Sequence, residues 1–307
     1  MADADVTRKP DPQDLGFVGL GNIGGALAAN LVSDGHRLVV HDRDGAREGA
    51  LVDAGARAAH DVAALAAATD VTFLSLPGPA IMEEVASRWL EGAREGAVLV
   101  DLTTNAPDVV RRVGAALARR GCALVEAPLT GGAPGARGRM LVFIVGGEPA
   151  AVQRVRPLLE TLGRAFFHMG PLGTGNTAKL VNSLFAFATT WVSLEGLAIC
   201  TRAGIDVRTM VEMVRAGGGG NMFITHMVEG LNQRGAPVQF ALDLAAKDAG
   251  LLVDLARELG VPTPVAAEVA QALVVARALG FGARDFTDLA SVMEALAGVE
   301  LRIRPPA

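Results

Sequence analysis

Hydrophobic and polar positions follow two different patterns along this chain. In the first half, short apolar runs that predict buried strands alternate with segments whose apolar residues recur every three or four positions, as in amphipathic helices. The predicted strands are residues 15–20, 37–41, 70–76, 97–102, 123–127 and 141–145, and the predicted helices are 25–33, 80–89, 107–120 and 149–162. This alternation predicts an α/β fold, a doubly wound sheet with helices on both faces.

The second half carries helical patterns only. A proline-free run from Gly173 to Gly204 has apolar residues almost all the way round, which predicts a helix that is buried on most sides. Further helices are expected over residues 206–216, 221–232, 239–259, 264–279 and 285–297. We therefore expect a disordered tail over residues 1–14, a sheet domain over 15–172 and an all-α C-terminal domain over 173–307.

Composition narrows the class of protein. The 307 residues are half hydrophobic and carry a formal net charge of -5 with both signs mixed, which argues against nucleic acid or an anionic membrane surface as a partner. The two cysteines, Cys122 and Cys200, lie far apart in apolar contexts, so we expect reduced side chains and no disulfide or metal site. The first residues lack the pattern of a signal peptide, and we expect a cytoplasmic protein.

The apolar run 184–200 could be mistaken for a membrane span. It contains Glu195, which would be costly in a lone membrane helix, together with threonine and serine side chains. Burial between domains or subunits is the better interpretation. We therefore expect no membrane contact, and a homodimer or homotetramer that covers this helix.

A glycine-rich segment follows the first predicted strand. Residues 19–24 read Gly-x-Gly-x-x-Gly, a helix follows directly, and Asp42 closes the next strand. In this arrangement the glycines permit a tight turn, a close backbone approach to a pyrophosphate and close helix packing, with the phosphates at the helix N-terminus. The alternative is a glycine-rich turn that only packs a helix. The predicted dinucleotide contacts in this Rossmann-type loop are Gly19, Gly21, Asn22, Ile23 and Gly24.

Two residues at the end of the second predicted strand bear on which dinucleotide binds. The Asp42 carboxylate can accept hydrogen bonds from the ribose 2′-hydroxyl of NAD and repels the 2′-phosphate of NADP. Arg43 could instead pair with that phosphate or stack on adenine, or it could be an exposed loop charge. Because the carboxylate stands directly at the strand end, we favour NAD and leave NADP open.

Polar loops follow three more of the predicted strands, at residues 76–77, 103–105 and 128–132. Ligands of doubly wound sheets bind at the carboxyl ends of the strands, so these loops are candidates for the site. In the third loop, glycines beside Thr130 expose backbone N–H groups that suit a carboxylate. A plain connection to the next strand is the alternative interpretation of this loop.

Two lysines in the helical half are candidates for chemistry. Lys179 lies three residues before Asn182 near the start of the long helix, so the two side chains share one face. A lysine on a buried helix is costly unless it is paired or functional, although it can also extend to solvent from the helix end. Lys247 precedes Asp248 after an apolar stretch, and an ion pair with Asp243 is its structural interpretation.

Together these segments resemble the β-hydroxyacid dehydrogenase family, which includes 3-hydroxyisobutyrate dehydrogenase and tartronate semialdehyde reductase. The resemblance runs from about Leu15 to Leu301 and rests on four blocks in the same order: GFVGLGNIGGALAANL, EAPLTGGAPGARGRM, GTGNTAKLVNS and AAKDAGL. The chain departs from the family pattern at Asn105, where relatives usually carry an apolar residue or a serine.

The resemblance implies hydride transfer between a nicotinamide cofactor and a small 3-hydroxy acid or semialdehyde. It implies that Lys179 is the general acid/base and that Asn182 orients the substrate. The implied contacts around the nicotinamide end of the cofactor are Leu76, Pro77, Thr104 and Lys247. The implied ligands of the carboxylate of the small substrate are Thr130, Gly131 and Gly132.

Two alternatives remain open at this point. The first is an NADPH-dependent reductase of imines or small aldehydes. The related imine reductases generally lack a lysine at the position of Lys179, which favours the alcohol/carbonyl reaction. The second is a non-catalytic dinucleotide-binding sensor, which would have no need for that lysine.

Overall fold

The computed structural model describes residues 11–232, 235 and 237–303. Within them the chain divides into two compact units, and the boundary lies between Lys179 and Leu180. Residues 1–10 of the expected N-terminal tail lie outside the described residues. The first strand, β1, begins at Asp14.

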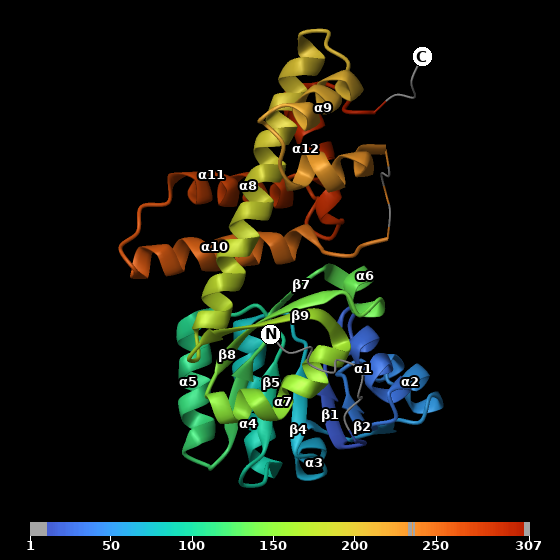
Figure 1. Cartoon of the computed structure of the whole chain (residues 1–307), viewed down its shortest axis with the longest axis vertical. Helices are drawn as coiled ribbons and strands as arrows, with labels where there is room; N and C mark the ends of the chain where they lie inside the picture. Colours follow the sequence, from blue (N-terminus) through green and yellow to red (C-terminus); the bar gives the residue numbers. More distant parts are fainter. Residues whose placement is uncertain (1–10, 233–234, 236, 304–307) are drawn as a thin grey trace, which may run out of the picture. The chain divides into compact units, whose positions relative to one another are not determined.

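The first unit is built on one mixed sheet with the strand order β3-β2-β1-β4-β5-β6-β8-β7, and β9 pairs with β8 (Figure 1). The strands from β3 to β6 in this order are all parallel, which is the order of doubly wound dinucleotide-binding sheets. Beyond them, β6 and β7 pair with β8 in antiparallel fashion. The predicted α/β class is therefore confirmed.

The strands of this sheet are β1 (Asp14–Val18), β2 (Arg37–His41), β3 (Arg57–Ala58), β4 (Val71–Leu74), β5 (Val98–Asp101), β6 (Ala123–Glu126), β7 (Leu129–Thr130), β8 (Leu141–Gly147) and β9 (Gly163–Gly170). The helices of the unit are α1 (Gly24–Ser33), α2 (Gly49–Asp53), α3 (Val62–Ala67), α4 (Pro79–Gly92), α5 (Pro107–Ala118), α6 (Gly132–Arg137) and α7 (Pro149–Leu162).

Apolar layers cover both faces of the sheet because successive residues of a strand point to opposite sides. On β1, Phe17 belongs to the core that contains Leu27 of α1, whereas Val18 belongs to the core that contains Trp89 of α4. The indole of Trp89 donates to Thr72 Oγ1 at 2.9 Å, so the one polar atom of this buried ring is satisfied.

The periodicity of the sequence did not predict the shortest elements. Strands of two residues, such as β3 and β7, and helices of five or six, such as α2 and α6, span too little chain for a period to show. The expected glycine-rich loop after Thr130 therefore contains a helix, α6. Strand β9 was not predicted for another reason. It lies at the sheet edge, and its residues are partly or fully exposed, so it carries no buried apolar run.

The second unit is helical around a core with three packed aromatic rings, Phe187, Phe240 and Phe286. Its main helices are the remainder of α8 (Thr174–Arg202), α9 (Val207–Ala216), α10 (Leu242–Glu258), α11 (Pro264–Ala278) and α12 (Leu289–Ala297). The helix expected over residues 221–232 is instead a π-helical turn followed by a 3-10 turn. The aromatic and β-branched residues that begin this segment have low helix propensity.

The expectation that the long helix α8 is buried on most sides is wrong for the single chain. Only 39% of its most apolar 18-residue window is buried, and Phe185, Val192 and Ile199 are 65%, 57% and 69% exposed. These residues recur every seven positions and so form one apolar stripe along the helix. Among the described residues α8 alone is long and apolar enough to cross a membrane, a test that core helices of soluble proteins also pass.

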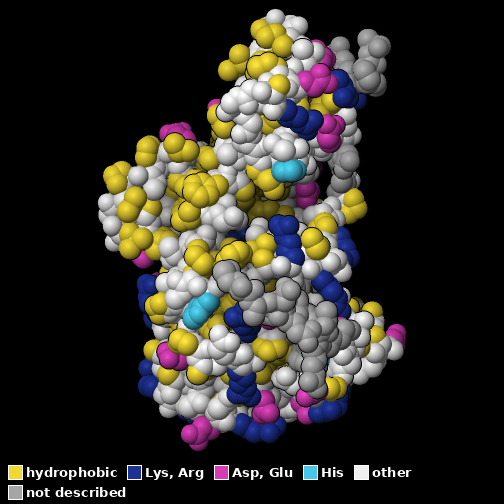
Figure 2. All heavy atoms as spheres, in the orientation of Figure 1, with side chains coloured by type: hydrophobic (Ala, Val, Ile, Leu, Met, Phe, Trp, Pro, Cys, Tyr) yellow, Lys and Arg dark blue, Asp and Glu magenta, His cyan; other side chains and the backbone are white. Residues whose placement is uncertain are grey.

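Other apolar side chains are exposed within the second unit. Figure 2 shows hydrophobic side chains gathered over the hairpin of α10 and α11. Those with more than a third of their surface exposed on this hairpin and its turn include Leu244, Leu259, Val261, Val265, Val274 and Val275. Both cysteines, Cys122 and Cys200, are reduced and buried, as expected.

Candidate functional site

The carboxyl ends of four neighbouring parallel strands lie in register at one edge of the sheet. Val18 of β1 pairs with Leu74 of β4, Leu74 pairs with Asp101 of β5, and Asp101 pairs with Glu126 of β6. The strand order reverses between β1 and β4, which is where doubly wound sheets bind ligands. The segments that leave these strand ends carry Gly19, Leu76, Thr104 and Thr130.

Packing requires two of the three fingerprint glycines but not the middle one. A Cβ at Gly19, whose φ is +89°, would lie 2.3 Å from Ser75 O, and a Cβ at Gly24 would lie 2.0 Å from Gly19 O. A Cβ at Gly21 would meet no atom closer than Arg47 Nη1, at 3.6 Å. The bare backbone at Gly21 therefore fits a ligand that approaches closely, as a pyrophosphate does.

The N-terminus of α1 follows this loop, and its N-cap side chain does not cap it. Its N-cap residue is Ile23, whose hydrocarbon side chain makes no capping hydrogen bond. The N–H groups of a helix's first turn lack partners within the helix and carry the positive end of its dipole. The residues present thus fit the phosphates of a dinucleotide.

Asp42 connects the glycine-rich loop to the end of β2. Its carboxylate accepts the N–H of Leu20 at 2.7 Å and that of Asp44 at 2.9 Å. Arg43, one of the predicted contacts, is exposed, and a second exposed arginine, Arg47, was not singled out from the sequence. A 3-10 turn at Gly45–Arg47 brings the Arg47 guanidinium to 3.9 Å from Asp42 Oδ2, above Gly21.

The loops after β4 and β5 are tied together through Thr103. Its hydroxyl oxygen accepts the N–H of Leu76 at 3.0 Å, and its own N–H donates to Asp101 Oδ1 at 3.1 Å. The bond to Leu76 fixes the backbone of the two loops that carry the predicted nicotinamide contacts. In these loops Leu76 and Thr104 are half-buried, whereas Pro77 is exposed.

The predicted substrate loop is built on left-handed backbone. Gly131 has φ +122° and Gly132 has φ +62°, conformations that residues with a side chain rarely adopt, and Thr130 before them is half-buried. The α6 segment that follows is attached to the cofactor helix, because Asn30 Nδ2 of α1 donates to Ala136 O at 2.8 Å.

The start of α8 is attached to the carboxyl end of β6. The Glu126 carboxylate accepts four N–H groups from this start, those of Gly173, Gly175 and Asn176 and the side-chain amide of Asn176. Lys179 lies three residues after Asn176, a rise of about 4.5 Å along the helix. Lys179 is half-buried and belongs to the first unit, as do the strand ends.

Two of the predicted site residues belong to the second unit. Asn182 is half-buried, one turn after Lys179 on α8. Lys247 on α10 forms an ion pair with Asp248 at 3.0 Å, and Asp243 forms one with Arg277 at 2.8 Å.

Two buried carboxyl groups were not anticipated from the sequence. Asp101 and Glu126 have no exposed surface, and burial raises the pKa of Asp101 to about 7. Burial also raises the pKa of Glu126, while the N–H groups that it accepts oppose this shift. Asn105, the departure from the family pattern, is buried beside Asp101 and Asn176. Its Nδ2 donates to Asp101 Oδ2 at 2.6 Å, and its N–H donates to Asn176 Oδ1 at 2.7 Å.

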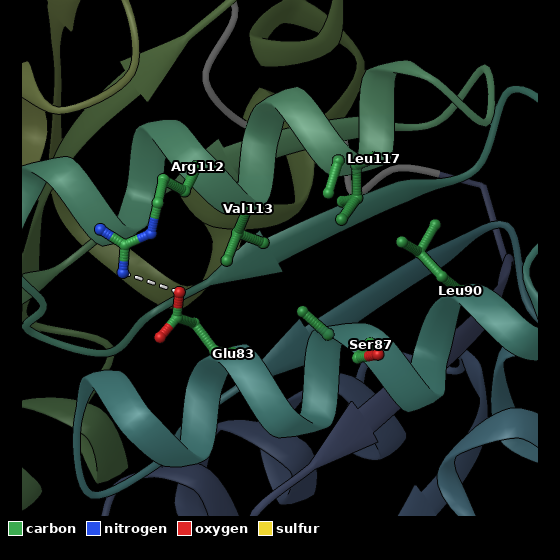
Figure 3. A pocket seen from close by; sticks show the side chains of 8 residues that line it. Glu83, Ser87, Leu90, Arg112, Val113 and Leu117 are labelled. Atoms are coloured by element: carbon green, nitrogen blue, oxygen red, sulfur yellow. Dashed lines mark hydrogen bonds and ion pairs between the residues drawn. The ribbon is translucent and has the colours of Figure 1, made fainter.

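A separate groove of about 280 Å³ runs between α4 and α5 (Figure 3). Apolar side chains such as Leu90 and Val113 line it, and Arg112 closes one end through an ion pair with Glu83 at 2.8 Å. Its residues lie along two helices on one face of the sheet and include none of the predicted site residues. We therefore place the candidate site at the strand ends.

Comparisons with known proteins identify the family of the chain. The family model for the NAD binding domain of 6-phosphogluconate dehydrogenase matches residues 14–170, and that for the NAD-binding region of NADP-dependent 3-hydroxyisobutyrate dehydrogenase matches residues 173–293. The 2-(hydroxymethyl)glutarate dehydrogenase of Eubacterium barkeri is 31% identical over 94% of this chain and 97% of its own. The 3-hydroxyisobutyrate dehydrogenase of Pseudomonas aeruginosa is 33% identical over 83% of this chain and 89% of its own.

A solved structure of the 3-hydroxyisobutyrate dehydrogenase of Mycobacterium tuberculosis with L-serine has the same fold. It superposes with a TM-score of 0.85 at 24% identity and covers 93% of this chain and 99% of its own. The fold, both family models and the curated relatives point to one class of enzyme. This chain belongs to the β-hydroxyacid dehydrogenase family and is a nicotinamide-dependent dehydrogenase of small hydroxy acids.

Proposed function

We propose that Lys179 is the general acid/base of this dehydrogenase, and that its substrates are small 3-hydroxy acids and the matching semialdehydes. The observation that carries the proposal is the anchoring of α8 on Glu126. It places the turn before Lys179 at the same sheet edge as the glycine-rich loop and the loops after β4 and β5. A half-buried lysine one turn after this anchored helix start supports the proposed role as acid/base.

Each proposed site residue then has a separate role in the reaction. The cofactor, when bound, supplies the hydride acceptor or donor. As the alcohol is oxidised, the Lys179 amine accepts the hydroxyl proton, and on reduction its ammonium returns a proton to the carbonyl oxygen. Thr130 and the backbone N–H groups of Gly131 and Gly132 hold the substrate carboxylate, and Asn182 orients the substrate.

For the cofactor, we propose a preference for NAD over NADP, with NADP still bound. Asp42 keeps a carboxylate at the end of β2, which repels a 2′-phosphate. Its oxygens already accept two backbone N–H groups, and Arg47 lies beside it. The remaining cofactor contacts that we propose are Asn22, Ile23, Arg43, Leu76, Pro77, Thr104 and Lys247.

We also propose a cytoplasmic homodimer or homotetramer. The apolar stripe of Phe185, Val192 and Ile199 leaves large side chains in water, and a second copy of the helix would cover it. Phe185→Glu is expected to lower the mass measured by light scattering after gel filtration to that of a smaller oligomer. A wild-type monomer at micromolar concentration would contradict this proposal.

The test of the main proposal is turnover of Lys179→Ala with a panel of small 3-hydroxy acids and semialdehydes. We expect kcat to fall about 10²- to 10⁴-fold, the usual contribution of general acid–base catalysis, while NADH still binds in a fluorescence titration. Unchanged turnover would contradict the role of Lys179. Turnover restricted to imines with NADPH would favour the imine reductase, and binding without any turnover would favour the sensor.

A further inference from the structure

The buried polar side chains at the sheet edge form one continuous chain of hydrogen bonds. It runs from the first turn of α8 through Glu126, Asn176, Asn105, Asp101 and Thr103 to the N–H of Leu76. Its donor–acceptor distances lie between 2.6 and 3.1 Å. Every member belongs to the first unit. These hydrogen bonds therefore connect the helix that carries Lys179 to the loop after β4, which carries Leu76, an expected nicotinamide contact.

Glu126 is the end of this chain nearest to Lys179, and its hydrogen bonds require a carboxylate. Oε1 accepts the N–H groups of Gly173 and Gly175 at 2.6 and 3.0 Å, and Oε2 accepts two from Asn176 at 3.0 and 2.6 Å. All four partners are donors, so a protonated or amide side chain would turn a donor toward a donor. Four charge-assisted bonds of this kind fix the position of the first turn closely.

The backbone around Glu126 is shaped to admit this arrangement. A Cβ at Gly146 of β8 would lie 2.2 Å from Glu126 Oε1, and a Cβ at Gly175 would lie 2.8 Å from Ile144 O. Glycine at both positions lets α8 start directly against β8 and over the carboxylate. The fit is close enough that a small change at Glu126 has to move the helix start.

Glu126 also precedes the substrate loop, since β6 ends at Glu126 and Thr130 ends β7 four residues later. Glu126 thus stands at the strand end from which the proposed carboxylate site follows, and beside the end of β5. Its side chain also holds the start of the helix that carries Lys179. Misplacing a catalytic group by about 1 Å can cost about 10²-fold in rate.

We propose that Glu126, acting with Asn176, is a positioning residue of the reaction. It holds the first turn of α8 so that Lys179 stands at a fixed place relative to the loops after β4 and β5. This inference rests on the proposed role of Lys179. Glu126 itself touches neither substrate nor cofactor and acts only through the helix that it anchors.

The test is a double-mutant cycle of Glu126→Gln and Lys179→Ala, read as kcat and as the Kd of NADH. We expect Glu126→Gln to lower kcat about 10- to 100-fold and to leave the NADH Kd within about twofold, because the phosphate contacts lie on α1. In the Lys179→Ala background the same substitution is expected to cost less than about threefold, because the group that it positions is gone.

Asn176→Ala serves as a second variant in case Glu126→Gln does not fold. It keeps the three backbone bonds to Glu126 and removes the bridge to Asn105, and we expect a smaller loss of kcat with the same non-additivity. Asp61→Ala is the matched control, since Asp61 caps α3 of the same unit through the N–H of Ala64 at 2.7 Å. Its kcat should stay within about twofold of wild type.

Three results would overturn the inference alone: wild-type kcat in Glu126→Gln, an equal loss in both backgrounds, or an NADH Kd that rises in parallel with the loss of kcat. Wild-type kcat in Lys179→Ala would overturn the proposed function and this inference with it. The two failures are therefore distinguishable in one set of four proteins.

Discussion

Two helix N-termini at the same edge of the first unit's sheet have opposite environments. The start of α1 has Ile23 as its N-cap, whose side chain makes no capping hydrogen bond. The start of α8 has its N–H groups filled by the buried carboxylate of Glu126. A helix that binds an anionic ligand has to leave its first turn open. A helix that carries a reactive side chain is held in a fixed position when a carboxylate of the protein, here that of Glu126, accepts its first N–H groups.

The largest expected effect tests the filled helix start. Glu126→Ala leaves four buried N–H groups without an acceptor, and we expect a loss of about 3–5 kcal/mol in the free energy of unfolding. Since about 1 kcal/mol shifts the melting temperature of a protein of this class by about 2–4 °C, Tm should fall by about 10 °C. Asp61→Ala, which removes an exposed cap, should cost only about 1 kcal/mol. Equal Tm values for the two variants would show that the hydrogen bonds of Glu126 stabilise the fold no more than an exposed helix cap does.

The next prediction compares two glycines at the open helix start. Gly24→Ala places a Cβ 2.0 Å from Gly19 O, and we expect overpacking to cost about 1–3 kcal/mol of stability. Gly21→Ala meets no close atom, so Tm should change little, but the added methyl group should raise the NADH Kd at least about tenfold. Thermal melts and fluorescence titrations separate the two effects. A Gly21→Ala protein with wild-type NADH affinity would contradict the placement of the pyrophosphate.

The hydrogen-bond chain from the start of α8 to Leu76 contains Asp101, which makes the free energy of unfolding depend on pH. Burial raises the pKa of Asp101 to about 7, so the folded chain binds more protons than the unfolded chain between about pH 4 and pH 7. Stability from this group is present at low pH and is lost as the pH rises through 7. Asp101→Asn is neutral at every pH, so its Tm relative to wild type should increase from pH 5 to pH 8. Glu126 faces the same site, and a constant difference would show that the proton resides there instead.

The smallest expected effect concerns Arg47, which lies over the open loop. If its guanidinium donates hydrogen bonds to a 2′-phosphate, Arg47→Ala should weaken NADPH binding by up to about fivefold and change NADH binding less, because the side chain is half exposed. Arg43→Ala is the comparison variant, because Arg43 is the other arginine of this segment that is proposed to contact the cofactor. A larger effect at Arg43 than at Arg47 would restore the original interpretation of the sequence.

Sequence patterns were sufficient for the parts of the fold that span one local segment. The glycines between a strand and a helix, the Asp42 strand end and the boundaries of α7 all follow from residues near one another in the chain. The environment of Glu126 could not be predicted in this way, because its partners lie 47 to 50 residues away. The local sequence of a strand that ends in a carboxylate is the same whether water or the start of a helix covers that carboxylate.

Long-range contacts also explain the other differences. Asn105 departs from the family pattern, but only the fold shows that it bridges Asp101 and Asn176. The apolar character of α8 predicted burial, yet periodicity cannot distinguish a core face from a face that a second subunit covers. Arg47 reaches the glycine-rich loop only because a 3-10 turn folds it back.

The most direct test of the central claim is chemical rescue of Lys179→Ala by small primary amines. If Lys179 transfers the proton, added methylamine should raise kcat of the variant in proportion to amine concentration and leave wild type unchanged, because the amine replaces the missing group. The account predicts this selective recovery in a variant that binds NADH normally. A variant that turns over at the wild-type rate without amine would contradict it.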